Sequence, residues 1–262
     1  MKTDDIRIVF FDIDGTLRAF DSTQLSPRTH DTLLQLQKNN IRICIATGRP
    51  PLTTPKFDGI DFDAIINFNG SYCIAGKDEI YKNPIETKAV HQIISNASKI
   101  GRPVVLSSID RMLANGRDED LVEYFKIANV EVPSGEGFEE LANQEIYQIM
   151  SGGRKSEYDA LLHGVTGAEI TTWRPRAVDI IPKNGSKAFG IQKVLKYFHL
   201  DKSQSLAFGD GGNDIAMLQS VGLGVAMGNA SDDVKHAAGA VCGSAENDGI
   251  YIFCKEHHLI GE

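Results

Sequence analysis

Short apolar runs alternate with amphipathic segments at the start of the chain. Residues 6–11 are β-branched and aromatic, which is typical of a strand buried on both faces of a parallel sheet. Residues 27–38 predict a helix, with Ser26 as its N-cap and Pro27 at the first helical position. A second apolar run at 41–46 completes a βαβ unit. The N-terminal part is therefore predicted to be an α/β fold with a parallel sheet.

The same pattern returns in the last third of the chain. Residues 187–198 predict an amphipathic helix, and residues 205–208 predict a buried strand. The further elements expected in the two ends are a strand at 64–68, a hairpin of 71–74 with 79–81, a strand at 222–226 and helices near Asp232 and Asp248. The two ends are predicted to share one doubly wound, Rossmann-like core of residues 1–82 and 183–262.

The order of elements changes between these two parts, at residues 83–182. Helical periodicity is found at 90–100, 121–128 and 157–163, and strands are expected at 103–106, 112–114, 146–150, 169–172 and 177–181. We interpret this segment as an α+β module inserted into the core.

Composition and charge narrow the classes of function. The chain has 27 basic and 35 acidic residues and a formal net charge of -8, so it has no broad field that attracts nucleic acid. No apolar run approaches the ~18 residues that cross a bilayer, and the acidic start lacks the apolar stretch of a signal peptide. We expect a cytoplasmic protein, a monomer or a weak homo-oligomer, with a small molecule as its partner.

Polar residues follow three of the predicted strands. Asp12 and Asp14 follow the first, Thr47, Gly48 and Arg49 follow the second, and the segment 209–214, with Asp210, Asn213 and Asp214, follows the strand at 205–208. Lys187 opens the helix that precedes this last strand. The carboxyl ends of parallel strands meet at one edge of a sheet, where ligands bind. Each motif alone also fits a solvated turn or an exposed lysine.

Four carboxylates gathered at one edge would repel one another unless a cation were present. The candidates carry only oxygen ligands, which favours a hard ion such as Mg²⁺. Lys187 and the donors at 47–49 would suit a phosphate dianion. A carboxylate nucleophile beside a second carboxyl group then fits phosphoryl transfer through an aspartyl-phosphate.

The four motifs, in this order, resemble the haloacid dehalogenase superfamily of phosphotransferases. They are D-x-D-G-T at 12–16, the threonine of A-T-G-R at Thr47, Lys187, and G-D-G-x-N-D at 209–214. The insertion between the second and third motifs is similar to the type IIB cap of the Cof-type phosphatases. The connection at 50–63 is shorter than in many relatives, so the longer helix that they have there is in doubt.

This resemblance implies a role for each motif residue. Asp12 would attack phosphorus, and Asp14 would protonate the leaving group and then deprotonate water. Thr47 and Lys187 would hold the phosphoryl oxygens, with help from the backbone near Ile13 and Gly48, and Asn213 would orient the phosphate or Lys187. Arg49, a fork-shaped donor to oxyanions, is a further candidate for phosphate binding. Mg²⁺ would be held by Asp12, the main-chain carbonyl of Asp14, and Asp210, with Asp214 as a direct or water-mediated ligand.

The resulting hypothesis is a Mg²⁺-dependent phosphatase of small phosphate monoesters, with sugar phosphates as the expected substrates. The alternatives are a phosphomutase that acts on sugar phosphates and a catalytically silent sensor of a phosphorylated ligand. The inserted module is expected to select the substrate. Trp173, Arg174 and Arg176 are candidates for this role, although packing and solvated charges explain them equally well.

Overall fold

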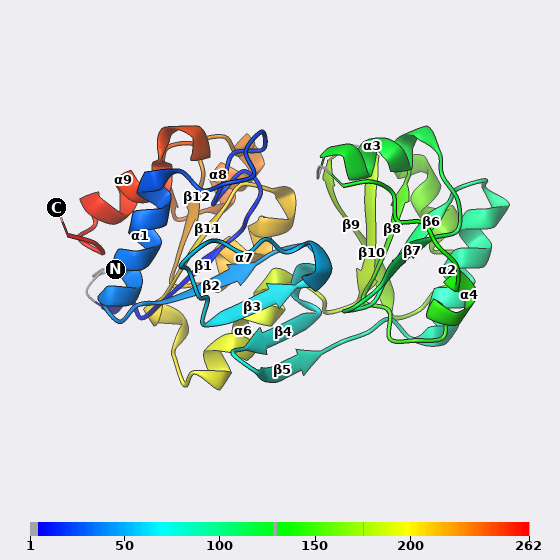
Figure 1. Cartoon of the computed structure of the whole chain (residues 1–262), viewed down its shortest axis with the longest axis horizontal. Coiled ribbons are helices and arrows are strands. Elements are labelled where there is room, and N and C mark those ends of the chain that lie inside the picture. Colours follow the sequence, from blue (N-terminus) through cyan, green and yellow to red (C-terminus); the bar gives the residue numbers. More distant parts are fainter. Residues whose placement is uncertain (1–4, 128–129, 175, 262) are drawn as a thin grey trace. The chain divides into compact units, whose positions relative to one another are not determined.

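The apolar runs at both ends of the chain pair into one eight-stranded sheet (Figure 1). The computed structural model describes residues 5–127, 130–174 and 176–261. In chain order the strands of this sheet are β1 (Ile8–Phe11), β2 (Arg42–Ala46), β3 (Ala64–Asn67), β4 (Tyr72–Ala75), β5 (Asp78–Lys82), β11 (Ser205–Gly209), β12 (Leu223–Ala226) and β13 (Ala240–Val241). Their order across the sheet is β13-β12-β11-β1-β2-β3-β4-β5. All neighbours from β13 to β3 are parallel, whereas β4 and β5 form an antiparallel hairpin.

Helices cover both faces of this sheet. One face packs against α1 (Pro27–Lys38) and α9 (Gly249–Glu256), and the other packs against α6 (Lys187–Tyr197), α7 (Ile215–Ser220) and α8 (Asp232–Ala237). Strand β1 is apolar throughout because it serves both faces: Val9 and Phe11 point to the first layer, and Ile8 and Phe10 to the second. The predicted doubly wound α/β core is confirmed.

The second unit contains residues 49–54 and 83–185. Its five strands are β6 (Val104–Ser107), β7 (Met112–Ala114), β8 (Gln148–Gly152), β9 (Ala168–Arg174) and β10 (Ala177–Pro182), in the order β7-β6-β8-β10-β9. All four pairings are antiparallel. The helices are α2 (Thr87–Lys99), α3 (Glu119–Ile127), α4 (Phe138–Leu141) and α5 (Tyr158–Leu161). Side chains of α2, α4 and α5 share one apolar cluster with this sheet, and α3 packs in a second cluster.

The second unit extends to Gly185, past the predicted boundary at residue 182. Hydrogen bonds explain this position. The Lys183 N–H donates to the Gly167 carbonyl at 2.8 Å, and the Asn83 amide donates to the Lys183 carbonyl at 3.2 Å. Residues 183–185, which follow β10, are therefore bonded to the second unit and belong to it.

Most elements lie where the periodicity placed them, with shifts at their ends. The helix expected at 121–128 is observed as Glu119–Ile127, and Ala128 lies outside the described residues. The helix expected at 157–163 ends at Leu161, after a 3-10 turn at Lys155–Glu157. Residues 50–63 contain a single 3-10 turn, Pro51–Thr53, and no α-helix, as the short connection suggested. No helix in the described ranges is long and apolar enough to span a membrane.

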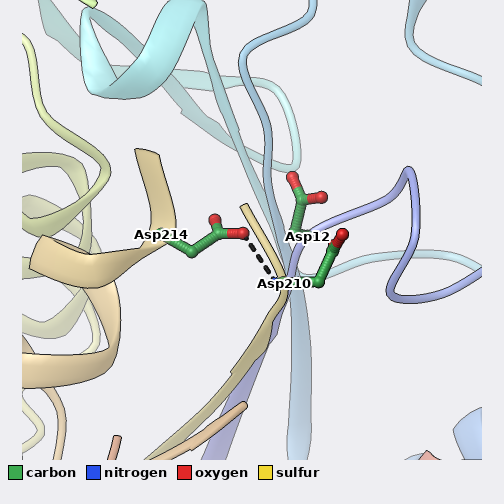
Figure 2. Close-up of side chains that lie close together, drawn as sticks. All are labelled: Asp12, Asp210 and Asp214. Atoms are coloured by element: carbon green, nitrogen blue, oxygen red, sulfur yellow. Dashed lines mark hydrogen bonds between the residues drawn. The ribbon is translucent and has the colours of Figure 1, made fainter. Parts of the chain in front are cut away.

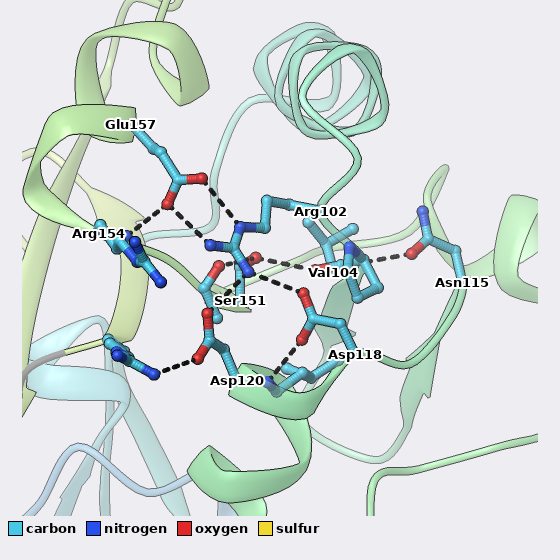
Figure 3. Close-up of polar contacts among 12 residues, drawn as sticks. Arg102, Val104, Asn115, Asp118, Asp120, Ser151, Arg154 and Glu157 are labelled. Carbon is cyan, nitrogen blue, oxygen red and sulfur yellow. Dashed lines mark hydrogen bonds and ion pairs between the residues drawn. The ribbon is translucent and has the colours of Figure 1, made fainter.

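A network of charged side chains ties four segments of the second unit together (Figure 3). Arg102, just after α2, donates through Nε and Nη2 to Glu157 at 3.1 and 3.0 Å. Its Nη1 donates to Asp118 and Asp120, at the start of α3, at 3.0 and 2.9 Å. Arg176 donates to the other oxygen of Asp120 at 3.0 Å. Every carboxylate in this network faces a guanidinium group.

Candidate active site

Strand register brings two acidic loops together at one edge of the first unit. Phe11 of β1 is the partner of Phe208 in β11, so Asp12 and Asp210 leave neighbouring parallel strands at nearly the same level. The Asp12 N–H extends this pairing by donating to the Phe208 carbonyl at 3.0 Å. These residues therefore emerge where parallel α/β sheets bind ligands.

Three carboxylates meet at this edge (Figure 2). Asp12, Asp210 and Asp214 each offer an oxygen, and these oxygens lie within 4.8 Å of one another. The residues are 8%, 9% and 0% exposed. Lys187, at 0% exposure, donates from Nζ to Asp12 Oδ1 and Asp214 Oδ1, both at 2.6 Å. Lys187 thus contacts two of the three buried carboxylates, and Asp210 accepts a hydrogen bond from Thr16 instead.

Burial and the crowding of carboxylates shift the pKa values of the site. Burial, together with the charges of Asp214 and Asp14, raises the pKa of Asp12 to about 7 despite the opposing effect of Lys187. Burial and the charges of Asp12 and Asp214 raise the pKa of Asp210 to about 8. Burial disfavours the Lys187 ammonium, but the two facing carboxylates outweigh this effect and raise its pKa. Near neutral pH the raised pKa values keep protons on these carboxyl groups, and a bound cation would take the place of those protons.

Backbone geometry fixes the acidic loops. Asp214 Oδ2 accepts the N–H groups of Asp210 and Gly211 at 2.9 and 2.8 Å. Thr16 Oγ donates to Asp210 Oδ1 at 2.7 Å. Gly15 has a φ of +84°, and a Cβ there would collide with the Asp210 carboxylate, so the close approach of the two loops requires glycine.

The second motif lies on the neighbouring strand. Thr47 directly follows β2 and is 2% exposed, and its N–H donates to the Ile66 carbonyl of β3 at 2.8 Å. Gly48 faces the side chain of Asn69, since a Cβ at Gly48 would lie 3.1 Å from both amide atoms of Asn69. Asn213, from the fourth motif, donates to Asn69 Oδ1 at 2.9 Å. The second and fourth motifs therefore meet through Asn69.

Asp14 lies outside the carboxylate trio. Its Oδ1 accepts two hydrogen bonds from Arg18, from Nε at 3.2 Å and from Nη2 at 2.9 Å. The metal contact predicted for Asp14 uses its main-chain carbonyl, and that contact stays a prediction. The Ile13 side chain is fully buried, which leaves only its backbone to meet a ligand. Arg49, grouped with the second unit, donates to the Thr53 carbonyl at 2.9 Å, and its proposed phosphate contact also stays a prediction.

The structure brings most of the predicted site residues of the first unit into one neighbourhood. Asp12, Asp210, Asp214 and Lys187 are in direct contact or within ligand distance, and Asn213 meets Asn69 beside Gly48. Sequence reasoning missed Thr16, Arg18 and Asn69 as members. Thr16 stands inside a recognised motif, and Asn69-Gly70 is a turn signal directly after β3, so two of the three had a local signal.

The substrate-selecting candidates of the second unit are only partly described. The side chains of Trp173 and Arg174 lie outside the described part of the structure. The Arg176 side chain is 58% exposed and forms an ion pair with Asp120. A structural role of this kind is the alternative to substrate selection that the sequence left open.

Comparison with known proteins identifies the family. The family model described as haloacid dehalogenase-like hydrolase matches residues 9–253. The chain belongs to the haloacid dehalogenase-like hydrolases. YkrA of Bacillus subtilis is 32% identical over 259 residues, covering 98% of this chain and 99% of that protein. YitU of the same organism, named as 5-amino-6-(5-phospho-D-ribitylamino)uracil phosphatase, is 29% identical, covering 95% of this chain and 97% of that protein.

A solved structure described as the subclass IIB sugar phosphatase BT4131 superposes with a TM-score of 0.86 at 31% identity. It covers 97% of this chain and 100% of its own. The resemblance seen in the four motifs is thereby confirmed over nearly the whole chain. This haloacid dehalogenase-like hydrolase is an enzyme of the phosphoric monoester hydrolase class.

Proposed function

We propose that this phosphatase hydrolyses small phosphate monoesters of the sugar-phosphate class, using Mg²⁺ and an aspartyl-phosphate formed on Asp12. The observation that carries the proposal is the buried set of three carboxylates, two of which contact Lys187. Such a set is unfavourable without a cation, and strongly shifted pKa values in a cluster of this kind mark functional sites.

The donor set fits a magnesium ion. Asp12, Asp210 and Asp214 supply carboxylate oxygens, and the cluster contains no histidine or cysteine that would favour a softer metal. Thr16 and the N–H groups of Asp210 and Gly211 hold two of the carboxylates in place. When bound, the ion would neutralise the carboxylates and polarise the phosphoryl oxygens.

The residues of this chain would then carry the steps. An oxygen of Asp12 attacks phosphorus, the bond from phosphorus to the ester oxygen breaks, and the departing alkoxide takes a proton from Asp14. Water next attacks the aspartyl-phosphate and gives its proton to Asp14, so that phosphate leaves and Asp12 is restored. Lys187 contributes a fixed positive charge that is already in contact with the nucleophile.

The substrate class is supported by the relatives. BT4131 is described as a sugar phosphatase, and YitU is named for a substrate that carries a phosphorylated ribityl group. Both align with almost the full length of this chain. A phosphorylated sugar or sugar alcohol is therefore the class we propose for this protein.

The test measures phosphate release from a panel of sugar phosphates, nucleotides and an aryl phosphate, with Mg²⁺. Asp12→Asn serves as the control because it keeps the shape of the side chain and removes the nucleophile. We expect release from sugar phosphates that disappears in the variant. An isomerised sugar phosphate without free phosphate would support a phosphomutase instead, and binding without turnover of any ester would support a sensor.

A further inference from the structure

A strained turn follows β3 at the edge of the sheet that carries the acidic trio. Phe68, Asn69 and Gly70 have φ angles of +50°, +53° and +104°. Consecutive residues in the left-handed conformation are uncommon unless they are glycines, and strained backbone of this kind is concentrated at functional sites. The turn is held in place at both sides: the Asn69 N–H donates to the Thr47 carbonyl at 3.1 Å, and a Cβ at Gly70 would collide with the Ser186 carbonyl.

This turn connects three of the four motifs. Its backbone is bonded to Thr47 and packed against the residue before Lys187, and the Asn69 side chain accepts from Asn213 at 2.9 Å. Asn69 itself is 3% exposed. This buried side chain lies beside Gly48, whose backbone is one of the groups expected to bind the phosphoryl group.

The side-chain amide of Asn69 contains a hydrogen-bond donor that no described residue accepts. Because Oδ1 accepts from Asn213, the Nδ2 group is the atom left to donate, and it has no hydrogen-bond partner among the described residues. A buried amide nitrogen without an acceptor is unfavourable, so such a group is expected to meet an acceptor in the working protein. Nδ2 borders Gly48, where the missing side chain leaves room: a Cβ there would be 3.1 Å away.

We propose that Asn69 is a further phosphate-binding residue, whose Nδ2 donates to an oxygen of the phosphate or phosphate ester and whose orientation is set by Asn213. The inference rests on the proposed function, since it deepens the assignment of that same site. Oxygen atoms of a phosphate are strong acceptors and would satisfy the buried donor.

The experiment measures the affinity of the Mg²⁺-loaded protein for inorganic phosphate by calorimetry, together with kcat and KM on its best substrate. The main variant is Asn69→Gly, because glycine tolerates the left-handed backbone and the fold is retained. Ser71→Ala is the matched control. Its hydroxyl is also buried and without a partner among the described residues, and it lies in the same chain segment. Thermal unfolding verifies that each variant is folded.

We expect Asn69→Gly to weaken phosphate binding about tenfold, the effect of one hydrogen bond to a charged group, and Ser71→Ala to remain within about twofold of the parent. Asn69→Asp separates donation from mere positioning, because it keeps an acceptor for Asn213 and replaces the Nδ2 donor by an oxygen. If Asn69 donates to phosphate, Asn69→Asp weakens binding at least as much as Asn69→Gly does. If Asn69→Asp binds phosphate as the parent does, Asn69 acts only through Asn213 and the assignment is overturned.

Unchanged phosphate affinity in Asn69→Gly would also overturn the assignment and leave a buried water as the acceptor. Failure of the broader proposal gives a different result. In that case the parent protein neither binds phosphate nor hydrolyses any ester of the panel, and both proposals fall together.

Discussion

Two clusters of three carboxylates in this chain have opposite electrostatics. In the first unit, Asp12, Asp210 and Asp214 are buried around Lys187, and the pKa values of Asp12 and Asp210 are raised. In the second unit, the acids Asp118, Asp120 and Glu157 face the arginines Arg102, Arg154 and Arg176, mostly through direct ion pairs.

The pKa values of two acids in the second cluster, Asp120 and Glu157, are shifted in the opposite direction. Partial burial works against the charge of Asp120, but hydrogen bonds from Arg102 and Arg176 outweigh it and lower its pKa. A hydrogen bond from Arg102 is the main reason why the pKa of Glu157 is lowered. A cluster that satisfies its own charges stabilises the fold, whereas one that leaves charge unsatisfied is prepared for a ligand.

The largest effect is expected from removing the nucleophile. Asp12→Asn should lower kcat by about a thousandfold or more, because the amide cannot form the aspartyl-phosphate. The same change removes one like charge, so the metal-free variant should unfold at the same or a higher temperature than the parent. Steady-state kinetics and thermal unfolding in EDTA measure the two effects. A variant that turns over at near-parental rates would place the chemistry elsewhere.

Metal removal should affect the first cluster alone. EDTA is expected to abolish phosphate release and Mg²⁺ to restore it. At a hundredfold excess over its Kd, a bound ion stabilises the folded state by about 2.7 kcal/mol, so Mg²⁺ should raise the unfolding temperature of the parent. Asp210→Asn is expected to reduce this rise, whereas Asp118→Asn should retain it. An equal loss of the Mg²⁺ response in both variants would contradict the distinction between the clusters.

Breaking the second cluster should cost stability rather than chemistry. Arg102→Met leaves Asp118, Asp120 and Glu157 without their shared partner, and we expect the free energy of unfolding to fall by about 3 kcal/mol. Arg28→Met is the matched control. The Arg28 side chain is 64% exposed, forms an ion pair with Asp248 and lies over the Tyr251 ring, so its loss should cost under ~1 kcal/mol. Equal costs in denaturant titrations would show that the network adds nothing beyond a surface ion pair.

The pKa of Asp179 is raised by burial and not by neighbouring carboxylates. It is 3% exposed, accepts from Tyr124 at 2.6 Å, and burial raises its pKa to about 6. The folded state therefore binds the proton more tightly than the unfolded state. The protonated Asp179 contributes to the free energy of unfolding in full below pH 4, and this contribution is lost as pH rises through 6. The loss amounts to roughly 1–3 kcal/mol.

Asp179→Asn should flatten this part of the pH dependence. The measurement is the free energy of unfolding of parent and variant between pH 4 and 7. Identical slopes in the two proteins would show that Asp179 does not titrate in this window.

The sequence predicted best what local signals determine. The bounds of α1 were correct because Ser26 caps its first turn, with its side chain accepting from the Thr29 N–H, and Pro27 starts the helix. The motif residues after β1, β2 and β11 were found because parallel strands end at one edge. In contrast, α4 and β13 were not predicted, since each is only a few residues long and depends on tertiary packing or pairing with β12.

Long-range contacts explain what the sequence could not predict in the site. Thr16 meets Asp210 across 194 positions, and Asn69 meets Asn213 across 144. Neither pairing leaves a pattern in local composition. The left-handed backbone at Asn69 is also imposed by its neighbours, because only the packed turn makes that conformation favourable.

The central claim is tested most directly by trapping the covalent intermediate. The Mg²⁺-loaded enzyme is mixed with its best sugar phosphate, quenched in acid within the first turnovers and digested for mass spectrometry. The account predicts a phosphate adduct on the peptide that contains Asp12, absent in Asp12→Asn and after EDTA treatment. Rapid phosphate release with no adduct on that peptide, or an adduct on a different residue, would contradict it.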